Sequence, residues 1–206
     1  SPPHLPPPLF TSDPHPSHLP LLLYQKALTT FIAKNQVNRI LVTPSLLQLL
    51  LDTFDKRKDT LKERLSCLKL MWLCGEVVTI EIVRRFCEIL PDARLINLYS
   101  ISECHDVSII DLASMDTANA PSQYASAGRI IPNVEVYCVD TEAKPWTRVP
   151  LGEPGEIFVG GPTLARGYLN MPEKTAERFV VNPFRRDSGE PGAHGGVADR
   201  LYRTGA

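Results

Sequence analysis

The sequence predicts an α/β fold, with a partial parallel sheet and flanking helices followed by a β-rich, distorted barrel-like subdomain. Between residues 21 and 107, short apolar runs alternate with segments of helical spacing. Elements that alternate in this way form parallel strands with right-handed crossovers. After about residue 107, no helical pattern of the same length appears, and short apolar runs between turn residues indicate antiparallel β structure.

Residues 1–20 precede the predicted fold and are dominated by proline. Because proline fixes φ and lacks a backbone donor, we expect an extended, disordered tail. An alternative is a ligand for a proline-recognising domain.

The first predicted elements are a helix at 21–34, a buried strand at 37–42 and a second helix. Pro44 suits the first turn of that second helix, and Thr43 is its expected N-cap. Residues 55–64 are expected to form a charged connection with one exposed helical turn.

The next predicted elements are an apolar strand at 68–73, a helix at 79–90 that Pro91 stops, and a strand at 94–99 with a polar loop after it. The α/β part is assigned to 21–120 and the β-rich part to 121–206. Within the β-rich part we expect strands at 134–139 and 155–160, a hairpin-like loop at 140–154, a helix at 172–179, a flexible loop at 187–199 and strand character over 201–206.

The composition excludes several classes of protein. The 206 residues are 43% hydrophobic and 22% charged, with a net charge of −1, so we expect a globular protein with no nucleic-acid partner. No run reaches the ~18 apolar residues of a membrane span, and no signal peptide is evident, so we expect no membrane association and a cytoplasmic location. The five cysteines lack C-x-x-C spacing, which indicates reduced thiols and argues against zinc.

The strand at 94–99 leads into the most informative polar cluster. Ligand sites of open α/β sheets lie at the carboxyl ends of strands. Tyr99 offers a ring for a planar heterocycle, Ser102 a hydroxyl for a phosphate, and Glu103 a carboxylate for Mg²⁺. These are the parts of a nucleotide site, although a strand followed by a polar loop is also ordinary surface structure.

Four separated segments carry a family resemblance. Residues 97–103 (NLYSISE) resemble N-x-Y-G-x-T-E, and residues 74–76 (CGE) resemble G-G-E. Residues 155–168 (GEIFVGGPTLARGY) resemble G-E-[LI]-x-[VI]-x-G…L-A-x-G-Y, and residues 202–205 (YRTG) resemble the start of Y-[RK]-T-G-D. The chain thus resembles the adenylate-forming (AMP-binding) enzymes, nearest to the amino-acid adenylation domains of nonribosomal peptide synthetases.

The resemblance implies a reaction and its reagents. A carboxylic acid, here an amino acid, attacks the α-phosphate of ATP to give an acyl-adenylate and pyrophosphate, and the acyl group passes to a thiol or amine. ATP and Mg²⁺ are the implied cofactors, phosphopantetheine or a CoA thiol the implied acceptor, and a carrier-protein domain an implied partner.

The resemblance also implies residue roles. Ser102 and Glu103 are the catalytic pair, with Ser102 bonding the α-phosphate and Glu103 holding Mg²⁺, while Tyr99 stacks on adenine. The implied nucleotide-binding positions are Cys74, Gly75, Glu76, Asn97, Tyr99, Ser100 and Ser102. The implied acid-binding positions are Trp72, Cys74, Leu98, Asp106 and Val107, with Ser45 as a further candidate.

Asp106 has two interpretations. A carboxylate in a pocket is costly unless it is paired, which favours a substrate that carries an amine. The alternative is an exposed loop residue.

Some positions depart from the family pattern. Cys74 and Ser100 stand where the family has glycine, which would weaken binding if the backbone there needs a positive φ. Ile101 stands where the family often has proline. Ala206 replaces the ribose-binding Asp, and no phosphate loop ending in Lys precedes the matched region. We therefore expect an incomplete, inactive fragment of a large N-terminal domain. The alternatives are an acyl-CoA synthetase-like ligase and a non-catalytic remnant that acts as a binding module.

Overall fold

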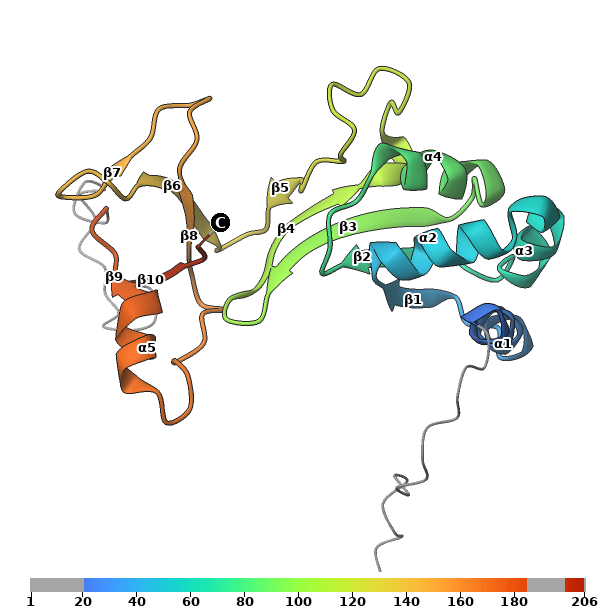
Figure 1. The fold of residues 1–206 in the computed structure, drawn as a ribbon, viewed down its shortest axis with the longest axis horizontal. Helices are drawn as coiled ribbons and strands as arrows, with labels where there is room; N and C mark the ends of the chain where they lie inside the picture. The colour runs from blue at the N-terminus through green and yellow to red at the C-terminus, as the bar shows by residue number, and fades with distance from the viewer. Residues whose placement is uncertain (1–20, 185–198, 206) are drawn as a thin grey trace, which may run out of the picture.

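The computed structural model describes residues 21–184 and 199–205, and it contains two five-stranded sheets at opposite ends of an elongated molecule (Figure 1). The first sheet is partly parallel and carries most of the helices, whereas the second is antiparallel. This arrangement confirms the predicted fold class. The predicted tail at 1–20 and all but the last residue of the loop predicted at 187–199 lie outside the described residues.

The first sheet has the strand order β1-β2-β3-β4-β5, and its first three strands are parallel. Its strands are β1 (Arg39–Val42), β2 (Leu70–Cys74), β3 (Arg94–Ile101), β4 (His105–Asp111) and β5 (Arg129–Ile130). The accompanying helices are α1 (Leu21–Lys34), α2 (Pro44–Thr53), η1 (Asp55–Arg57), α3 (Lys58–Arg64), α4 (Ile80–Ile89) and η2 (Leu112–Ser114).

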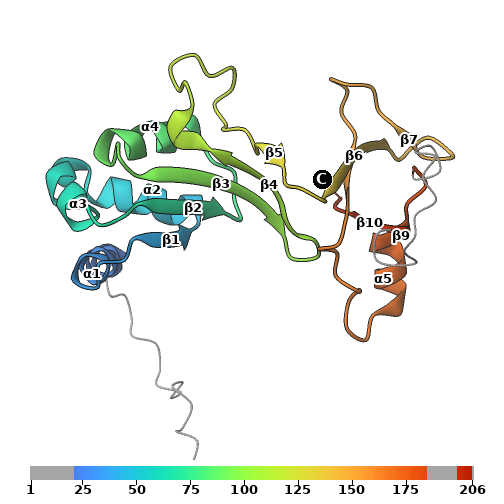
Figure 2. The same ribbon diagram turned by 180° about the vertical axis from the view of Figure 1, so that it is seen from behind.

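One face of this sheet packs against α2 and α4 (Figure 2). Leu73 and Leu95 from the strands and Phe86 from α4 are at most 1% exposed in this core. The N-terminus of α2 forms as predicted: Pro44 occupies the first turn, and the Thr43 hydroxyl accepts a hydrogen bond from the Leu46 N–H at 3.2 Å. The opposite face of the sheet leaves Leu41 and Ile109 exposed.

Two local predictions were wrong. The charged connection forms α3, which buries Leu61 and is followed by the buried Leu65, because these leucines lie four residues apart and share one helical face. The polar loop after β3 is shorter than predicted, since β4 begins at His105 and pairs antiparallel with β3. His105 has a φ of 59°, and the chain reverses within a tight turn.

The second sheet has the order β7-β6-β8-β10-β9 and is antiparallel throughout. Its strands are β6 (Glu135–Asp140), β7 (Thr147–Arg148), β8 (Glu156–Gly160), β9 (Phe179–Val181) and β10 (Arg200–Arg203), with α5 (Pro172–Arg178) before β9. The predicted hairpin-like loop contains β7, which pairs with β6. Strand β5 pairs with β4 and so belongs to the first sheet, which means that the second sheet starts at β6. The division of the chain into an α/β part and a β-rich part at residue 121 stays a prediction.

Gly128 provides a test of the close packing between β4 and the segment that enters β5. Its φ is +92°, and a Cβ there would overlap the backbone of Ile109. Gly75 has nearly the same φ, +90°, but nothing within 4 Å of the Cβ position. We expect Gly75→Ala to cost about 1 kcal/mol of unfolding free energy for its backbone conformation. Gly128→Ala should lower the unfolding free energy by about 1–3 kcal/mol more than Gly75→Ala, because the new methyl group would also clash with the Ile109 backbone.

Urea unfolding followed by circular dichroism measures both variants. If Gly75→Ala and Gly128→Ala lowered the unfolding free energy equally, the close packing at Gly128 would be contradicted.

Candidate functional site

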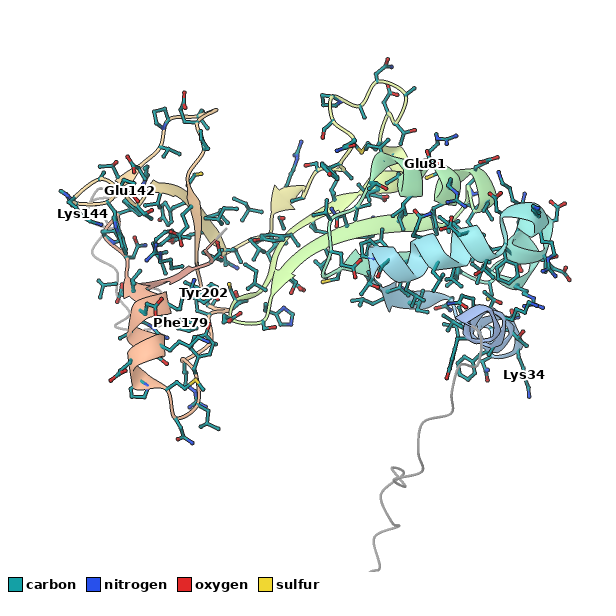
Figure 3. The ribbon with its side chains drawn as sticks, in the orientation of Figure 1. Lys34, Glu81, Glu142, Lys144, Phe179 and Tyr202 are labelled. Carbon is teal, nitrogen blue, oxygen red and sulfur yellow. The ribbon has the colours of Figure 1, made fainter. Side chains whose placement is uncertain are left out.

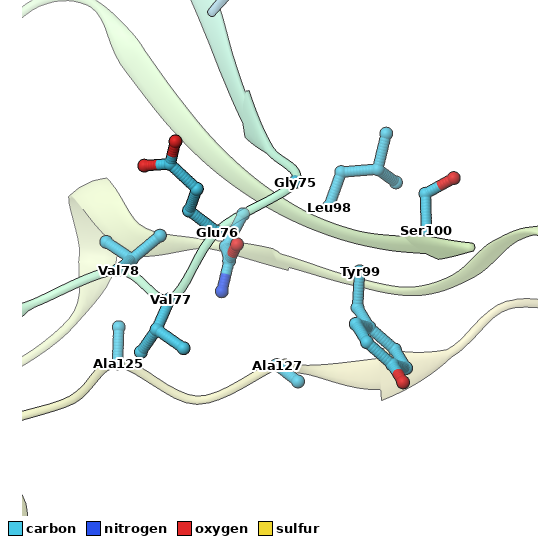
Figure 4. A pocket seen from close by; sticks show the side chains of 10 residues that line it. Gly75, Glu76, Val77, Val78, Leu98, Tyr99, Ser100, Ala125 and Ala127 are labelled. Atoms are coloured by element: carbon cyan, nitrogen blue, oxygen red, sulfur yellow. The ribbon is translucent and has the colours of Figure 1, made fainter. Parts of the chain in front are cut away.

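A cavity of about 360 Å³ lies beside the carboxyl-terminal half of β3 (Figure 4). This volume falls within the roughly 300–1,000 Å³ of small-molecule pockets. Its wall is formed by the loop that leaves β2, by β3 and by residues 125–127. The cavity brings together five predicted nucleotide-binding residues: Gly75, Glu76, Asn97, Tyr99 and Ser100.

Hydrogen bonds fix the wall that faces β3. The buried Asn97 donates through Nδ2 to the Ser126 carbonyl at 2.9 Å, and Ser108 Oγ donates to the Ala127 carbonyl at 2.8 Å. The Ala125 N–H donates to the Val78 carbonyl at 2.9 Å. The segment at 125–127 therefore joins the sheet to the loop after β2 and closes one side of the cavity.

Tyr99 presents its ring within this cavity, close to Ala127 in Figure 4. Partial burial raises the pKa of the Tyr99 phenol above its ordinary value, so the phenol is neutral at physiological pH. A neutral ring in a partly apolar cavity is suited to stacking on a planar heterocycle.

The two departures from glycine cause no backbone strain. Among the described residues, the non-glycine positions with positive φ are Gln36, His105, Asn133 and Asn170. Neither Cys74 nor Ser100 belongs to this group, because Cys74 ends β2 and Ser100 lies within β3. The positive φ in this region falls on Gly75, where glycine is retained.

Glu103 lies in the turn between β3 and β4 and contacts the second sheet. Its Oε1 accepts a hydrogen bond from the Tyr168 hydroxyl at 2.6 Å, and its carbonyl accepts one from the Ala165 N–H at 2.7 Å. The bond from Tyr168 is the main cause that holds the pKa of Glu103 below its ordinary value. Glu103 is therefore a charged carboxylate, whereas the neighbouring Ser102 is exposed to solvent. Neither residue lines the cavity that contains Tyr99.

The contacts around Tyr168 explain why glycine precedes it and why threonine follows seven residues later. Gly167 has a φ of +151°, and a Cβ there would overlap the side chain of Thr175. Thr175 Oγ1 accepts from the Tyr168 N–H at 2.9 Å and donates to the Met171 carbonyl at 2.8 Å. Glycine and threonine eight residues apart thus position Tyr168, a residue that the sequence motif contained but to which no role was assigned.

Aromatic rings support Tyr168 from the second sheet. The Tyr168 ring packs on Phe179 with centroids 5.7 Å apart. Phe179 in turn packs on Tyr202, with centroids 5.1 Å apart, and Figure 3 labels these two residues. The Tyr168 and Tyr202 oxygens lie 3.3 Å apart. Since Tyr168 donates to Glu103, its oxygen is available to accept from Tyr202.

Glu103 fits the role of a magnesium ligand in its chemistry. No cluster of three or more His, Cys, Asp or Glu side chains that could hold a metal ion exists within residues 21–184 and 199–205. Mg²⁺ in nucleotide sites is commonly held by one or two carboxylates together with substrate phosphates and waters. A single charged carboxylate is compatible with that mode of binding.

A second hollow, of about 420 Å³, brings together three of the predicted acid-binding residues: Trp72, Leu98 and Asp106. Arg39 and Leu41 from β1 and Ile109 from β4 also line it. Leu98 lines both hollows, whereas Asn97 and Tyr99 line the first cavity and not the second. Cys74 lines neither hollow, although it ends β2 opposite Leu98.

A register shift separates Asp106 from Val107. Tyr99 lies opposite Ser108, but Ser100 lies opposite Asp106, so Val107 has no partner on β3. Such a bulge changes the side to which the following residues point. Asp106 consequently lines the second hollow, whereas Val107 is 2% exposed in a cluster with Val159 of the second sheet.

Ser45, the further acid-site candidate, does not line the second hollow. Its N–H and its hydroxyl donate to the two carboxylate oxygens of Glu76, at 2.9 and 2.8 Å.

Comparison with known proteins identifies the family. The family model for AMP-binding enzymes matches residues 15–169. The chain belongs to the AMP-binding enzyme family. One curated relative in this family, glycine betaine reductase ATRR of Emericella nidulans, is 37% identical over 179 residues, which are 87% of this chain and 13% of the relative.

Two solved structures share the fold. CmiS6 superposes with a TM-score of 0.70 at 26% identity, covering 89% of this chain and 40% of CmiS6. The nonribosomal peptide synthetase FmoA3, in its AMPPNP-bound form, also has a TM-score of 0.70, at 25% identity, covering 88% of this chain and 18% of FmoA3. This AMP-binding chain therefore spans well under half the length of these relatives.

Within residues 21–184 and 199–205, no helix is both long enough and apolar enough to cross a membrane.

The hydrogen bond between Tyr168 and Glu103 predicts a pH-dependent stability. A carboxylate with a depressed pKa stabilises the fold above its unfolded-state pKa of about 4.3, and this contribution is lost as the pH falls through the folded-state value. We expect Tyr168→Phe to lower the unfolding free energy by about 1 kcal/mol at pH 7. The difference from the wild type should shrink as the pH falls below about 4.

Denaturant unfolding at several pH values measures this difference. Tyr124→Phe is the matched control, because Tyr124 is about half exposed and its hydroxyl has no hydrogen bond among the described residues. A loss for Tyr168→Phe that is independent of pH would contradict the role of the Glu103 charge.

Proposed function

We propose that this AMP-binding chain supplies the adenine-binding and acid-binding parts of an enzyme that activates an amino acid with ATP. The product is an acyl-adenylate, formed when the carboxylate attacks the α-phosphate and pyrophosphate leaves. The observation that supports this most strongly is the convergence of Gly75, Asn97 and Tyr99 on one cavity. The AMPPNP-bound form of FmoA3 adds independent support for a nucleotide ligand in this fold.

Each side chain has a defined task in this proposal. Tyr99 stacks on the adenine, and the backbone of Gly75 and Glu76 lines the adenine side of the cavity. The exposed hydroxyl of Ser102 donates to an oxygen of the α-phosphate, where negative charge is stabilised during transfer. Glu103 holds Mg²⁺, and Tyr168 orients its carboxylate. When bound, the metal ion neutralises phosphate charge.

The second hollow is suited to an acid with a positively charged nitrogen. Asp106 provides a carboxylate in that hollow, and Trp72 provides an aromatic face that attracts cations. The relative ATRR is named for glycine betaine, an acid with a quaternary ammonium group. We therefore assign Asp106 to the substrate nitrogen.

The acceptor and the cellular context follow from the same family. We propose that the acyl group passes either to the phosphopantetheine thiol of a carrier-protein domain or to the thiol of free CoA. The proposed location is the cytoplasm, where ATP is available. Because the chain spans 13% of ATRR and 40% of CmiS6, we propose that it lacks groups needed for the reaction and is inactive alone.

The alternative of a non-catalytic remnant rests on Cys74, Ser100, Ile101 and Ala206. The absence of a positive φ at Cys74 and Ser100 weakens that alternative.

Nucleotide binding tests the proposal on the chain itself. Titration calorimetry with AMP should detect saturable binding, and Tyr99→Ala should weaken it about tenfold, because stacking on one base contributes about 1–3 kcal/mol. Tyr24→Ala is the matched control, since Tyr24 is an exposed tyrosine of α1. Absence of AMP binding to the wild-type chain would overturn the proposed adenine site.

The role of Asp106 is tested by pyrophosphate exchange in the full-length protein that carries this chain, with a panel of acids. Asp106→Asn should raise KM at least about tenfold for acids with a cationic nitrogen and leave other acids unchanged, because a charge-assisted contact contributes about 1.5–3 kcal/mol. Asp59→Asn, at an exposed carboxylate of α3, is the control. Equal losses for all acids would remove the assignment of Asp106 to the nitrogen.

A further inference from the structure

Glu76 contributes to the nucleotide cavity in an unexpected way. It lines the cavity, yet Figure 4 shows its carboxylate turned away from the Tyr99 ring. The carboxylate instead receives both hydrogen bonds from Ser45, one from the N–H and one from the hydroxyl. Glu76 therefore presents its backbone to the cavity and uses its side chain as an anchor.

The anchor lies at the N-terminus of α2, where a negative charge is favourable. Ser45 is the second residue of this ten-residue helix, and its N–H is one of those that the helix itself leaves without a partner. The Thr43 oxygen lies 2.9 Å from Ser45 Oγ, so the N-cap and the anchor form one hydrogen-bonded cluster. The Glu76 carboxylate thus completes the capping of α2 from a separate loop.

The loop that carries Glu76 has limited support elsewhere. Gly75 adopts a φ of +90° with open space around its Cβ position, and Val77 is 67% exposed. The loop is fixed at its start by β2 and again at Val78, whose carbonyl accepts from the Ala125 N–H. Between these two points, the bonds from Ser45 are the side-chain anchor that the structure provides within the described residues.

From this geometry we propose that Ser45 is a positioning residue for the nucleotide site. It holds Glu76 so that the backbone from Gly75 to Val78 keeps the shape that accepts a planar base. Ser45 touches neither cavity, so its effect passes through Glu76. This inference rests on the proposed adenine site and identifies the contact that keeps one wall of that site in place.

Titration of AMP into the purified chain tests the inference. Ser45→Ala removes the hydroxyl and should weaken AMP binding about threefold to tenfold, because hydrogen bonds to charged groups are among the stronger ones but this pair is exposed to solvent. Ser45→Thr keeps the hydroxyl and should restore most of the affinity. Gln48→Ala is the matched control, since it removes a side-chain hydrogen bond to Asp52 from the same helix.

The full-length protein gives a second measurement that a general loss of stability would not produce. In pyrophosphate exchange, Ser45→Ala should raise KM for ATP while KM for the acid stays unchanged. Failure of this inference is distinguishable from failure of the proposed function. If the wild-type chain binds AMP and Ser45→Ala binds it equally well, the positioning role is wrong; if the wild-type chain binds no AMP, the adenine site itself is wrong.

Discussion

The attachment of Glu103 to the segment around Tyr168 joins the two halves of the molecule. The turn between β3 and β4 reaches the second sheet, and there the Glu103 carboxylate and carbonyl both accept hydrogen bonds from residues about 60 positions later in the chain. The aromatic cluster of Tyr168, Phe179 and Tyr202 fixes the donor side of this contact. Because β3 also carries Tyr99, any movement of the second sheet relative to the first would change the position of Glu103 relative to the cavity.

Strand β3 contributes residues to both hollows. Asn97 and Tyr99 line the cavity that is closed by residues 125–127. Leu98 lines this cavity and also the hollow that contains Trp72 and Asp106. The proposed nucleotide site and the proposed acid site can therefore adjoin along one short segment of backbone. In an adenylating enzyme such proximity is useful, because the carboxylate and the α-phosphate must meet with little freedom of orientation.

The fold class and many elements could be predicted from local patterns. Helical spacing identified α1, α2 and α4, and Thr43 with Pro44 identified the start of α2, because caps and periodicity are properties of neighbouring residues. The prediction failed at α3, where the buried leucines Leu61 and Leu65 stand among many charged residues, so the apolar face of the helix is hard to recognise in the sequence. It also failed at the start of β4, since the polar residues after β3 resemble a loop although they continue into a hairpin.

By itself, the sequence determined the chemical content of this protein: the residues of the motifs, their order, and hence the family. The tertiary structure decided which of those residues meet. The register shift in β4 turned Asp106 into the second hollow and Val107 into the core, and helix α2 holds the Glu76 carboxylate away from the Tyr99 ring in the cavity beside β3. A motif records which groups are present, but their directions depend on pairing register and on partners far away in the chain, which local sequence does not encode.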